Sequence, residues 1–496
     1  MYGARKKDNP LLKEPRKDVI GAFAAAGLLN HHRHKRIHVS FIGVVHKACL
    51  ICSFAGPYPQ NPYLEISRAH LGVQGGLTGS VDHVAVQASS AAMSNPSDLF
   101  PPTRAAGLAR LEAFLPHAGA DYARLRNYET GAEISGAVSM LSAYLRCRLI
   151  TPAEVMRPVV ACHGSKAADK FIAEVFWGIY WRGWLANRPS VWAGYQSDLQ
   201  RLFNEIQTQS GLRQQWETAC LGQTGIAPFD HWATELVRTG YLHNHARMWF
   251  ASIWIHTLRL PWQLGADFFL RHLPDGDPAS NTLSWRWVAG IQTLGKAYLA
   301  TEDNIATFTR GRFSDVPGLA QTPADVAAHP HPAPAPLPQD GRPLPGKRSG
   351  VLLHTDDLDI SHVLALTDTI TAYARVNPSA QQGPWQQAPA VTAFRNSAID
   401  DVAQRHAAQL GASGASVATA DGLADWARAE RLQQIVAPSA PTGPVRDLFV
   451  AYTALPDSPP LIELRAALDE AAWPLATKGF FPFRKHIPAL LSGIGI

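Results

Sequence analysis

The sequence predicts a mainly α-helical protein with a small α/β module at its C-terminal end. Three observations predict this fold class. Between about residues 104 and 312, apolar residues recur at spacings of three and four, the period of amphipathic helices. Residues 322–349 contain eight prolines, a composition typical of an extended, semi-rigid linker. Beyond this linker, short apolar runs alternate with helical patterns, which is typical of a small parallel sheet.

The composition is that of a globular chain with an unusual number of tryptophans. The 496 residues are enough for two or three domains, and 14 of them are Trp, which suits an aromatic-lined site. The formal net charge is only +5, so any binding to nucleic acid must come from local basic patches. No apolar run reaches the length of a membrane span.

The cysteines form no framework that would indicate disulfides or a metal. Cys49 and Cys52 make one Cys-x-x-Cys pair, but the second pair of a zinc site is missing, so we expect no metal. Scattered cysteines suit a reducing compartment. The apolar segment Val19–Leu29 lacks a convincing signal-peptide cleavage site. We therefore expect a cytoplasmic protein.

Four segments are expected along the chain. Residues 1–92 have no sustained periodicity, and the sequence from Met93 onward resembles a natural start, so this irregular extension is expected to carry no function of its own. The helical domain follows in residues 93–321, the Pro-rich linker in 322–349, and the α/β module in 350–496.

The stretch 239–304 carries more polar side chains than a helical core needs. Asn244 and Arg247 lie three residues apart, so a helix places both on one face. Asp277 precedes Pro278, which suits a helix cap followed by a first helical residue. Capping uses one such residue at each helix start, so it leaves further polar residues of this stretch unexplained. The pattern favours a ligand site.

This stretch resembles the flavin-binding region of the photolyase/cryptochrome family. The family pattern is approximately G-x-M-H-N-R-x-R-M, then a Trp, then D-G-D-x-A-x-N-x-x-x-W-x-W. The matching residues are Gly240, His243, Asn244, Arg247, Met248, Trp262, Asp275, Gly276, Asp277, Ala279, Asn281, Trp285 and Trp287. The resemblance covers about residues 104–312 and implies a photolyase-like helical domain that binds FAD. It further implies that Arg247 pairs with Asp275 and that Asn244 faces the flavin.

Two upstream segments extend this resemblance. Residues 138–142 are similar to the family's loop and helix that meet the FAD pyrophosphate, although Met140 stands where an Arg is usual. The cofactor-binding residues that the resemblance implies are Tyr122, Val138, Ser139, Met140, Leu141, Ser142, Trp177, Asn244, Arg247, Asp275, Gly276, Asp277 and Asn281.

The resemblance implies repair of pyrimidine dimers in damaged DNA by light-driven electron transfer. Trp285 and Trp262 match the first two members of the family's Trp relay, while Trp216 or Trp192 could serve as the third. Asn244 is expected to contact the substrate as well as the flavin. The expected DNA contacts are Asn244, His245, Arg238, Arg286, Arg310 and Arg312.

Two other functions stay open. In a cryptochrome-like photoreceptor the same FAD would signal to a partner without repair. Ile179 favours it, because the resemblance places there the Glu that contacts damaged bases. A Trp181–Arg182 pair lies one helical turn later, with no assigned role. In a non-catalytic nucleic-acid-binding module FAD would be lost, and the intact polar residues of the flavin region argue against it.

The α/β module is expected to be a relocated, reduced counterpart of the family's antenna domain. Family members carry that domain before the helical domain, whereas residues 350–496 follow it here. The segment 355–358, Thr-Asp-Asp-Leu, resembles the opening of the antenna domain. The aromatic residues near the C-terminus that are expected to dock on the helical body are Trp473, Phe480, Phe481 and Phe483.

Overall fold

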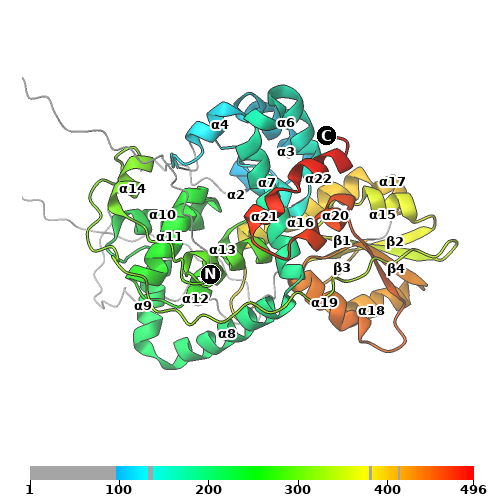
Figure 1. Ribbon diagram of the computed structural model, residues 1–496. Coiled ribbons are helices and arrows are strands. Elements are labelled where there is room, and N and C mark those ends of the chain that lie inside the picture. The colour runs from blue at the N-terminus through cyan, green and yellow to red at the C-terminus, as the bar shows by residue number, and fades with distance from the viewer. Residues whose placement is uncertain (1–95, 132–137, 379–382, 412–413) are drawn as a thin grey trace, which may run out of the picture. The chain divides into compact units, whose positions relative to one another are not determined.

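The computed structural model describes residues 96–131, 138–378, 383–411 and 414–496 (Figure 1). The irregular extension expected in residues 1–92 lies outside this part of the chain. Residues 88–496 form one compact unit. Among the described residues, no helix combines the length and the apolar character that crossing a bilayer requires.

The first half of the described chain is helical. Its first helices are α2 (Pro96–Leu99), α3 (Arg104–Phe114), α4 (Ala120–Leu125), α5 (Ser142–Cys147), α6 (Pro152–Ala167), α7 (Asp169–Ala186), α8 (Pro189–Thr208), α9 (Ser210–Cys220) and α10 (Ala227–Thr239). The next are α11 (Asn244–Ser252), α12 (Trp262–His272), α13 (Pro278–Val288) and α14 (Glu302–Phe308). A π-helical segment, Ile253–Thr257, continues α11.

The sequence marks several of these helix starts chemically. Thr151 and Glu154 form a reciprocal capping box at the start of α6, which satisfies two backbone N–H groups that lack helical partners. Pro278 is the first residue of α13, a position that has no use for a backbone N–H. These caps fix where α6 and α13 begin.

Helices α12 and α13 pack closely because one position carries no side chain. A Cβ atom at Gly265 of α12 would clash with the indole ring of Trp285 on α13. Trp285 is 2% exposed and packs edge-on against Phe269, with ring centroids 5.1 Å apart. The glycine therefore sets how closely the two helices approach.

The Pro-rich segment 322–349 contains no helix, and hydrogen bonds hold it to its neighbours. The backbone N–H of Ala335 donates to the carbonyl of Asn187 at 2.7 Å, and Arg188 Nε donates to the carbonyl of Pro332 at 3.0 Å. Near its end, Gly341 N–H donates to the carbonyl of Glu463 at 3.0 Å. The segment thus runs as a tethered strap from the helical part to the sheet.

The C-terminal part contains a five-stranded parallel sheet in the order β3-β2-β1-β4-β5. The strands are β1 (Ser349–His354), β2 (Ile370–Val376), β3 (Gly414–Val417), β4 (Gln434–Pro438) and β5 (Leu461–Leu464). The helices between and after them are α15 (Ser361–Leu366), α16 (Pro389–Arg405), α17 (Ala407–Leu410), α18 (Ala420–Ala429), α19 (Pro444–Thr453), α20 (Ala467–Ala472), α21 (Phe480–Arg484) and α22 (Ile487–Gly493). The predicted fold class, a helical domain followed by a small α/β module, is confirmed.

The two faces of the sheet enter different hydrophobic cores, because successive side chains of a strand point in opposite directions. Val351 and Leu353 of β1 join the core that also contains the helical domain, with Phe394 of α16. Leu352 and the alternate residues of β4 join a second core beneath α18 and α19. Figure 1 shows α18 and α19 on one side of the sheet and α16 on the other.

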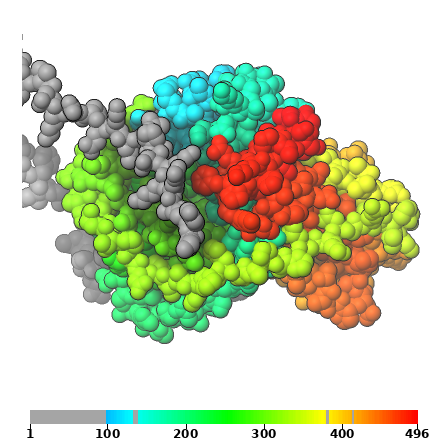
Figure 2. Space-filling view, viewed as in Figure 1, coloured from blue at the N-terminus to red at the C-terminus, as the bar shows by residue number. Residues whose placement is uncertain are grey.

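The C-terminal helices return to the helical domain. Helices α20 and α21 contact α7, and Figure 2 shows the C-terminal residues, in red, against the helical part of the surface. Trp473, Phe480 and Phe483 are buried, as expected for docking residues. Phe481 is 74% exposed, so this one does not dock: it lies on the outward side of the short helix α21.

Candidate flavin site

Arg247 and Asp275 form the bidentate pair that the resemblance implies. Arg247 Nη1 and Nη2 donate to the two carboxylate oxygens of Asp275 at 3.1 and 2.8 Å. Arg247 Nε also donates to the carbonyl of Leu242 at 2.9 Å, so three of its N–H groups are directed by the protein. A planar guanidinium held in this way is a fixed positive charge.

Asn244 lies one helical turn before Arg247 and is exposed. It is the first residue of α11, where His243 caps the helix by accepting a hydrogen bond at Nδ1 from the backbone N–H of His245. Burial is the main cause that lowers the pKa of His243, to about 4, so its imidazole is neutral near pH 7. The Nε2 atom of His243 is buried and has no hydrogen-bond partner among the described residues.

The turn Asp275–Asp277 directs its two carboxylates to different partners. Asp277 Oδ1 accepts from the backbone N–H of Ser280 at 2.9 Å and caps α13, while Oδ2 accepts from Arg182 Nε at 2.8 Å. Burial alone would raise the pKa of Asp277, but Arg182 and then Arg146 lower it below its usual value. A Cβ atom at Gly276 would come within 2.9 Å of the carbonyl oxygen of Leu273, so the turn requires glycine there.

Asn281, one turn into α13, serves the structure as well. Its Nδ2 donates to the carbonyl of Ala266 at 2.8 Å, which ties α13 to α12.

The predicted phosphate-binding segment lies at the start of α5. Ser142, the first residue of α5, is exposed, and Ser139 Oγ accepts a hydrogen bond from the backbone N–H of Leu141 at 3.4 Å. Met140 is buried and has a positive φ of 50°, while Val138 is half-buried.

Tyr122 is buried on α4. Its ring meets Phe114 and Phe171 edge-on, with centroids 5.9 and 5.2 Å apart. The ring therefore belongs to an aromatic cluster of the core, and burial raises the pKa of its phenol.

Trp177 lies on α7 and stacks on a residue from the far end of the chain. Its ring and that of Phe480 are 3.6 Å apart and inclined by 13°. At the next position, Gly178, a Cβ atom would have no neighbour within 4 Å, so α7 leaves open space there. One face of Trp177 is thus covered by the C-terminal segment.

The two predicted relay tryptophans have different aromatic neighbours. Trp285 meets Trp254 edge-on at 6.2 Å, and its indole N–H has no partner among the described residues. Trp262 lies 5.6 Å from Tyr195, which in turn lies 5.3 Å from Trp192. Of the two candidates for a third member, Trp192 is therefore linked to Trp262 through a tyrosine.

Trp216, the other candidate, packs instead against Trp385, with ring centroids 5.1 Å apart and an interplanar angle of 32°.

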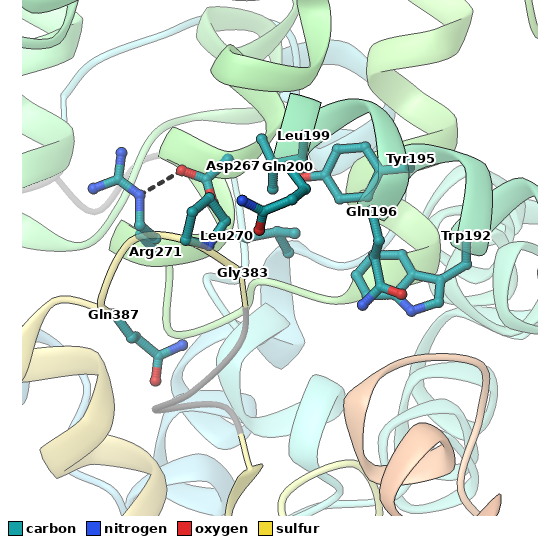
Figure 3. Close-up of a pocket in the computed structure, with 11 residues that line it drawn as sticks. Trp192, Tyr195, Gln196, Leu199, Gln200, Asp267, Leu270, Arg271, Gly383 and Gln387 are labelled. Atoms are coloured by element: carbon teal, nitrogen blue, oxygen red, sulfur yellow. Dashed lines mark hydrogen bonds and ion pairs between the residues drawn. The ribbon is translucent and has the colours of Figure 1, made fainter. Parts of the chain in front are cut away.

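A cavity of about 150 Å³ lies at the Trp192 end of this series. Figure 3 shows Tyr195 and Trp192 of α8 lining it together with Asp267 and Arg271 of α12. Asp267 and Arg271 form a buried pair at 2.6 Å, and the Tyr195 hydroxyl has no hydrogen-bond partner among the described residues. The row of rings formed by Trp262, Tyr195 and Trp192 thus ends beside polar groups. Gly383 lies next to Leu199 of α8 at this cavity.

The predicted DNA contacts differ in how far they are exposed and in how they are paired. His245 stacks on Trp249 at 4.1 Å, and Arg286 is half-buried and donates to Gln292 at 3.2 Å. Burial lowers the pKa of Arg286, so its charge is not displayed on an open surface. Arg312 pairs with Glu129.

Arg310 is exposed at a positive φ of 55°, with its guanidinium over the Tyr128 ring. It is thus better placed for a phosphate than Arg286. Arg238, on α10, is half-buried.

The described residues fit FAD in their chemistry. Arg247 supplies a fixed cation for an electron-rich ring, and Asn244 supplies an exposed amide on the same helix face. The half-exposed Gly178 leaves open space beside Trp177, so the described side chains leave room on this side of α7.

Comparison with known proteins agrees with this geometry. Residues 171–339 match the family described as the FAD binding domain of DNA photolyase. The helical part of this chain is thus similar to the photolyase/cryptochrome family, as the sequence predicts. FAD is the cofactor of this photolyase-type domain, which confirms the expectation from the sequence.

Curated relatives of the photolyase-type domain are named deoxyribodipyrimidine photo-lyase. The protein of Streptomyces griseus is 32% identical over 172 residues, which are 34% of this chain and 36% of that protein. The protein of Escherichia coli (strain K12) is 27% identical over 286 residues, 55% of this chain and 56% of that protein. The chain therefore spans between about a third and just over half of the length of these relatives.

Solved photolyase and cryptochrome structures are similar over a comparable share. A bacterial class III photolyase from Agrobacterium tumefaciens is 25% identical with a TM-score of 0.36, covering 43% of this chain and 44% of that one. The cryptochrome of Synechocystis sp. PCC6803 is 25% identical with a TM-score of 0.35, covering 42% and 45%. The family assignment rests on the sequence matches.

Several residues around the flavin turn have no counterpart in the sequence predictions. No sequence pattern assigns a role to Arg182, and none marks Arg146, Asp356 or Arg395 as a site residue. The one local signal was the position of Arg182, a helical turn after the segment that departs from the family pattern. Arg395 carries no such signal, because it reaches the turn from α16, more than a hundred residues along the chain.

Proposed function

We propose that this chain is an FAD-dependent, blue-light-driven enzyme that splits pyrimidine dimers in damaged DNA by electron transfer. The observation that carries this proposal is the bidentate Arg247–Asp275 pair, one helical turn from the exposed amide of Asn244. A buried carboxylate that fixes a cation beside an exposed amide suits the binding of a reduced, negatively charged flavin. Bound FAD would supply the excited-state electron.

The chain's own residues orient the reactants and supply electrons. Arg247 provides a positive charge whose position is already fixed, so it needs no rearrangement when negative charge develops. Trp285, in an apolar setting, can be oxidised more easily than the phenylalanines around it. Asn244 and Arg310 are exposed and can contact the dimer and a neighbouring phosphate. A dimer stacks weakly, which lowers the cost of extruding it from the duplex.

A cryptochrome-like photoreceptor is the second candidate. Two observations favour it: Ile179 is 4% exposed within the core, and Phe480 covers one face of Trp177. An apolar residue at position 179 provides no carboxylate for damaged bases. In this reading the same flavin site would pass a light signal to a partner protein.

A light-dependent repair assay separates these functions. The full chain is purified, its visible absorbance is recorded, and an oligonucleotide with one thymine dimer is irradiated with blue light in its presence. We expect flavin absorbance and restoration of the intact thymines in light only. Asn244→Ala should keep FAD and lose most of the repair, because it removes one amide and leaves the Arg247–Asp275 pair.

Flavin absorbance without repair would favour the photoreceptor. Absence of flavin with salt-dependent DNA binding would favour the non-catalytic binding module.

A further inference from the structure

We propose that the C-terminal α/β module is part of the flavin site, because it positions the turn Asp275–Asp277. The loop after β1 and helix α16 hold this turn where Asp275 pairs with Arg247. The inference rests on FAD binding at this turn and goes beyond it by assigning a positioning function to residues of the other module.

Two buried arginines of the helical domain bridge the turn and the loop. Arg146 Nε donates to the carbonyl of Gly276 at 3.1 Å, and its other nitrogens bind the carbonyl of Thr355 and the carboxylate of Asp356, the latter at 2.7 Å. Arg182 Nε binds Asp277, while its Nη1 donates to the carbonyl of Asp356 at 3.1 Å. Each guanidinium therefore has one side on the flavin turn and the other on the α/β module.

Arg395 of α16 reaches the turn directly. Its Nη2 donates to the same Gly276 carbonyl at 3.1 Å, although the side chain is only 2% exposed. Its Nε has no partner among the described residues, and its charge has no carboxylate among the ion pairs found there. Burial and the nearby Arg146 lower its pKa to about 9. A buried cation with so few partners lowers the stability of the fold. The presence of Arg395 at this position is therefore better explained by a function, here the positioning of the turn.

The adjacent residue of the same loop provides a matched control. Asp357 is as buried as Asp356, and it pairs with Arg148 at 2.7 Å. Arg148 also pairs with Asp469, and these contacts do not reach the flavin turn. Asp356 and Asp357 thus bind two arginines of α5 and its end across the same interface, but only Asp356 is connected to Gly276.

The Gly276 carbonyl consequently accepts from two guanidinium groups. Removing either donor leaves the carbonyl with one guanidinium partner, so the Gly276–Asp277 peptide is held less firmly, and we expect the Asp275 carboxylate to be less well placed for Arg247. We therefore expect FAD to bind more weakly and the polar surroundings of the flavin ring to change, even where the fold is retained.

The test compares four substitutions in the full chain: Asp356→Asn, Asp357→Asn, Arg395→Met and Arg395→Lys. Three quantities are measured: the Kd for FAD added to flavin-free protein, the visible circular dichroism of bound flavin, and the Tm of the flavin-free protein. We expect Asp356→Asn and Arg395→Met to raise the Kd at least tenfold and to change the flavin dichroism. Asp357→Asn should change the Kd less than twofold despite a similar loss of Tm.

Arg395→Met separates positioning from folding. Replacing an incompletely paired buried cation by an apolar side chain of similar length should keep or raise the Tm of the flavin-free protein. Arg395→Lys should recover part of the affinity, since an ammonium group can donate to the Gly276 carbonyl.

Equal changes in Kd for Asp356→Asn and Asp357→Asn, or an unchanged Kd for Arg395→Met, would overturn the inference while leaving the flavin site intact. Failure of the unmodified chain to bind FAD would overturn the proposed function and this inference together.

Discussion

At the scale of single residues, some side chains of the flavin region offer a reactive group and others only fill space in the core. Trp285 does both. Its ring fills the space that Gly265 leaves on α12, and its indole is the oxidisable group that we propose as the first member of the Trp relay. A substitution at position 285 that keeps an aromatic ring but removes the indole can therefore separate the packing role of Trp285 from its proposed role as an electron donor.

Trp285→Phe is expected to leave FAD bound and to slow photoreduction of the flavin at least tenfold. Phenylalanine keeps an aromatic ring in the core, but it is much harder to oxidise than indole. The measurement is the rate of loss of oxidised-flavin absorbance under blue light with an external reductant. Trp216→Phe is the control, because its ring packs against Trp385 and not against Trp262 or Tyr195. An unchanged rate in Trp285→Phe would mean that this residue is only part of the core.

His243 makes the protein sensitive to mild acid. Its pKa of about 4 in the folded chain lies below the value of about 6.5 expected in the unfolded chain. Between these values the unfolded chain binds more protons, so stability falls as pH decreases below 6.5. At pH 5 the loss from this group is about 2 kcal/mol relative to pH 7.5. Denaturant titrations at both pH values should show a smaller difference in His243→Gln.

At the scale of elements, the strap of residues 322–349 shows how far composition predicts structure. Its prolines indicate an extended backbone, and the structure has no helix in this segment. The contacts that hold the strap could not be predicted. Many of them are made by backbone carbonyls, such as that of Pro332, and every residue type has a backbone carbonyl. The partner, Arg188, precedes a proline at a helix start and gives no sign of a distant contact.

Arg188→Met is expected to loosen this strap. Arg188 donates to Pro332 and to the carbonyl of Thr477 at 2.8 Å and lies over the Trp184 ring, so it joins the strap, α7 and the C-terminal segment. Losing these contacts should lower the free energy of unfolding by about 2 kcal/mol. Thermolysin should then cut within residues 322–349 faster than in the unmodified chain.

The exposed Arg342, on the same strap, provides the control Arg342→Met. Equal cleavage rates in the two variants would show that Arg188 does not hold the strap.

At the scale of the whole molecule, the helical domain and the α/β module share one core. Val351 and Leu353 of β1 pack in the same cluster as residues of α7 and α12. The sequence predicted both architectures and the alternation of strands and helices. It could not predict that one face of the sheet is buried against the helical domain, because apolar residues on either face look alike in a strand that is buried on both sides.

Unfolding of residues 88–496 is therefore expected to be one cooperative transition. A shared core means that separating the modules exposes apolar surface of both at once. Far-ultraviolet circular dichroism reports mainly the helices, and a fluorescent probe at an exposed position of the C-terminal part, such as Val450, follows that module. The two melting curves should coincide within about 2 °C; two separated transitions would mean that the modules unfold independently.

The contacts of the Gly276 carbonyl also set a time order during synthesis. A ribosome that has just added Asn281 has made Arg146, Arg182 and the turn, but Arg395 is still 114 residues away. At about 5–20 residues per second, translation needs roughly 6–23 s to reach it. The loop after β1 is made before Arg395, and until Asp356 is added the guanidinium groups of Arg146 and Arg182 lack their partners in that loop. The nascent helical domain must therefore wait for the last third of its chain before its cofactor turn is complete.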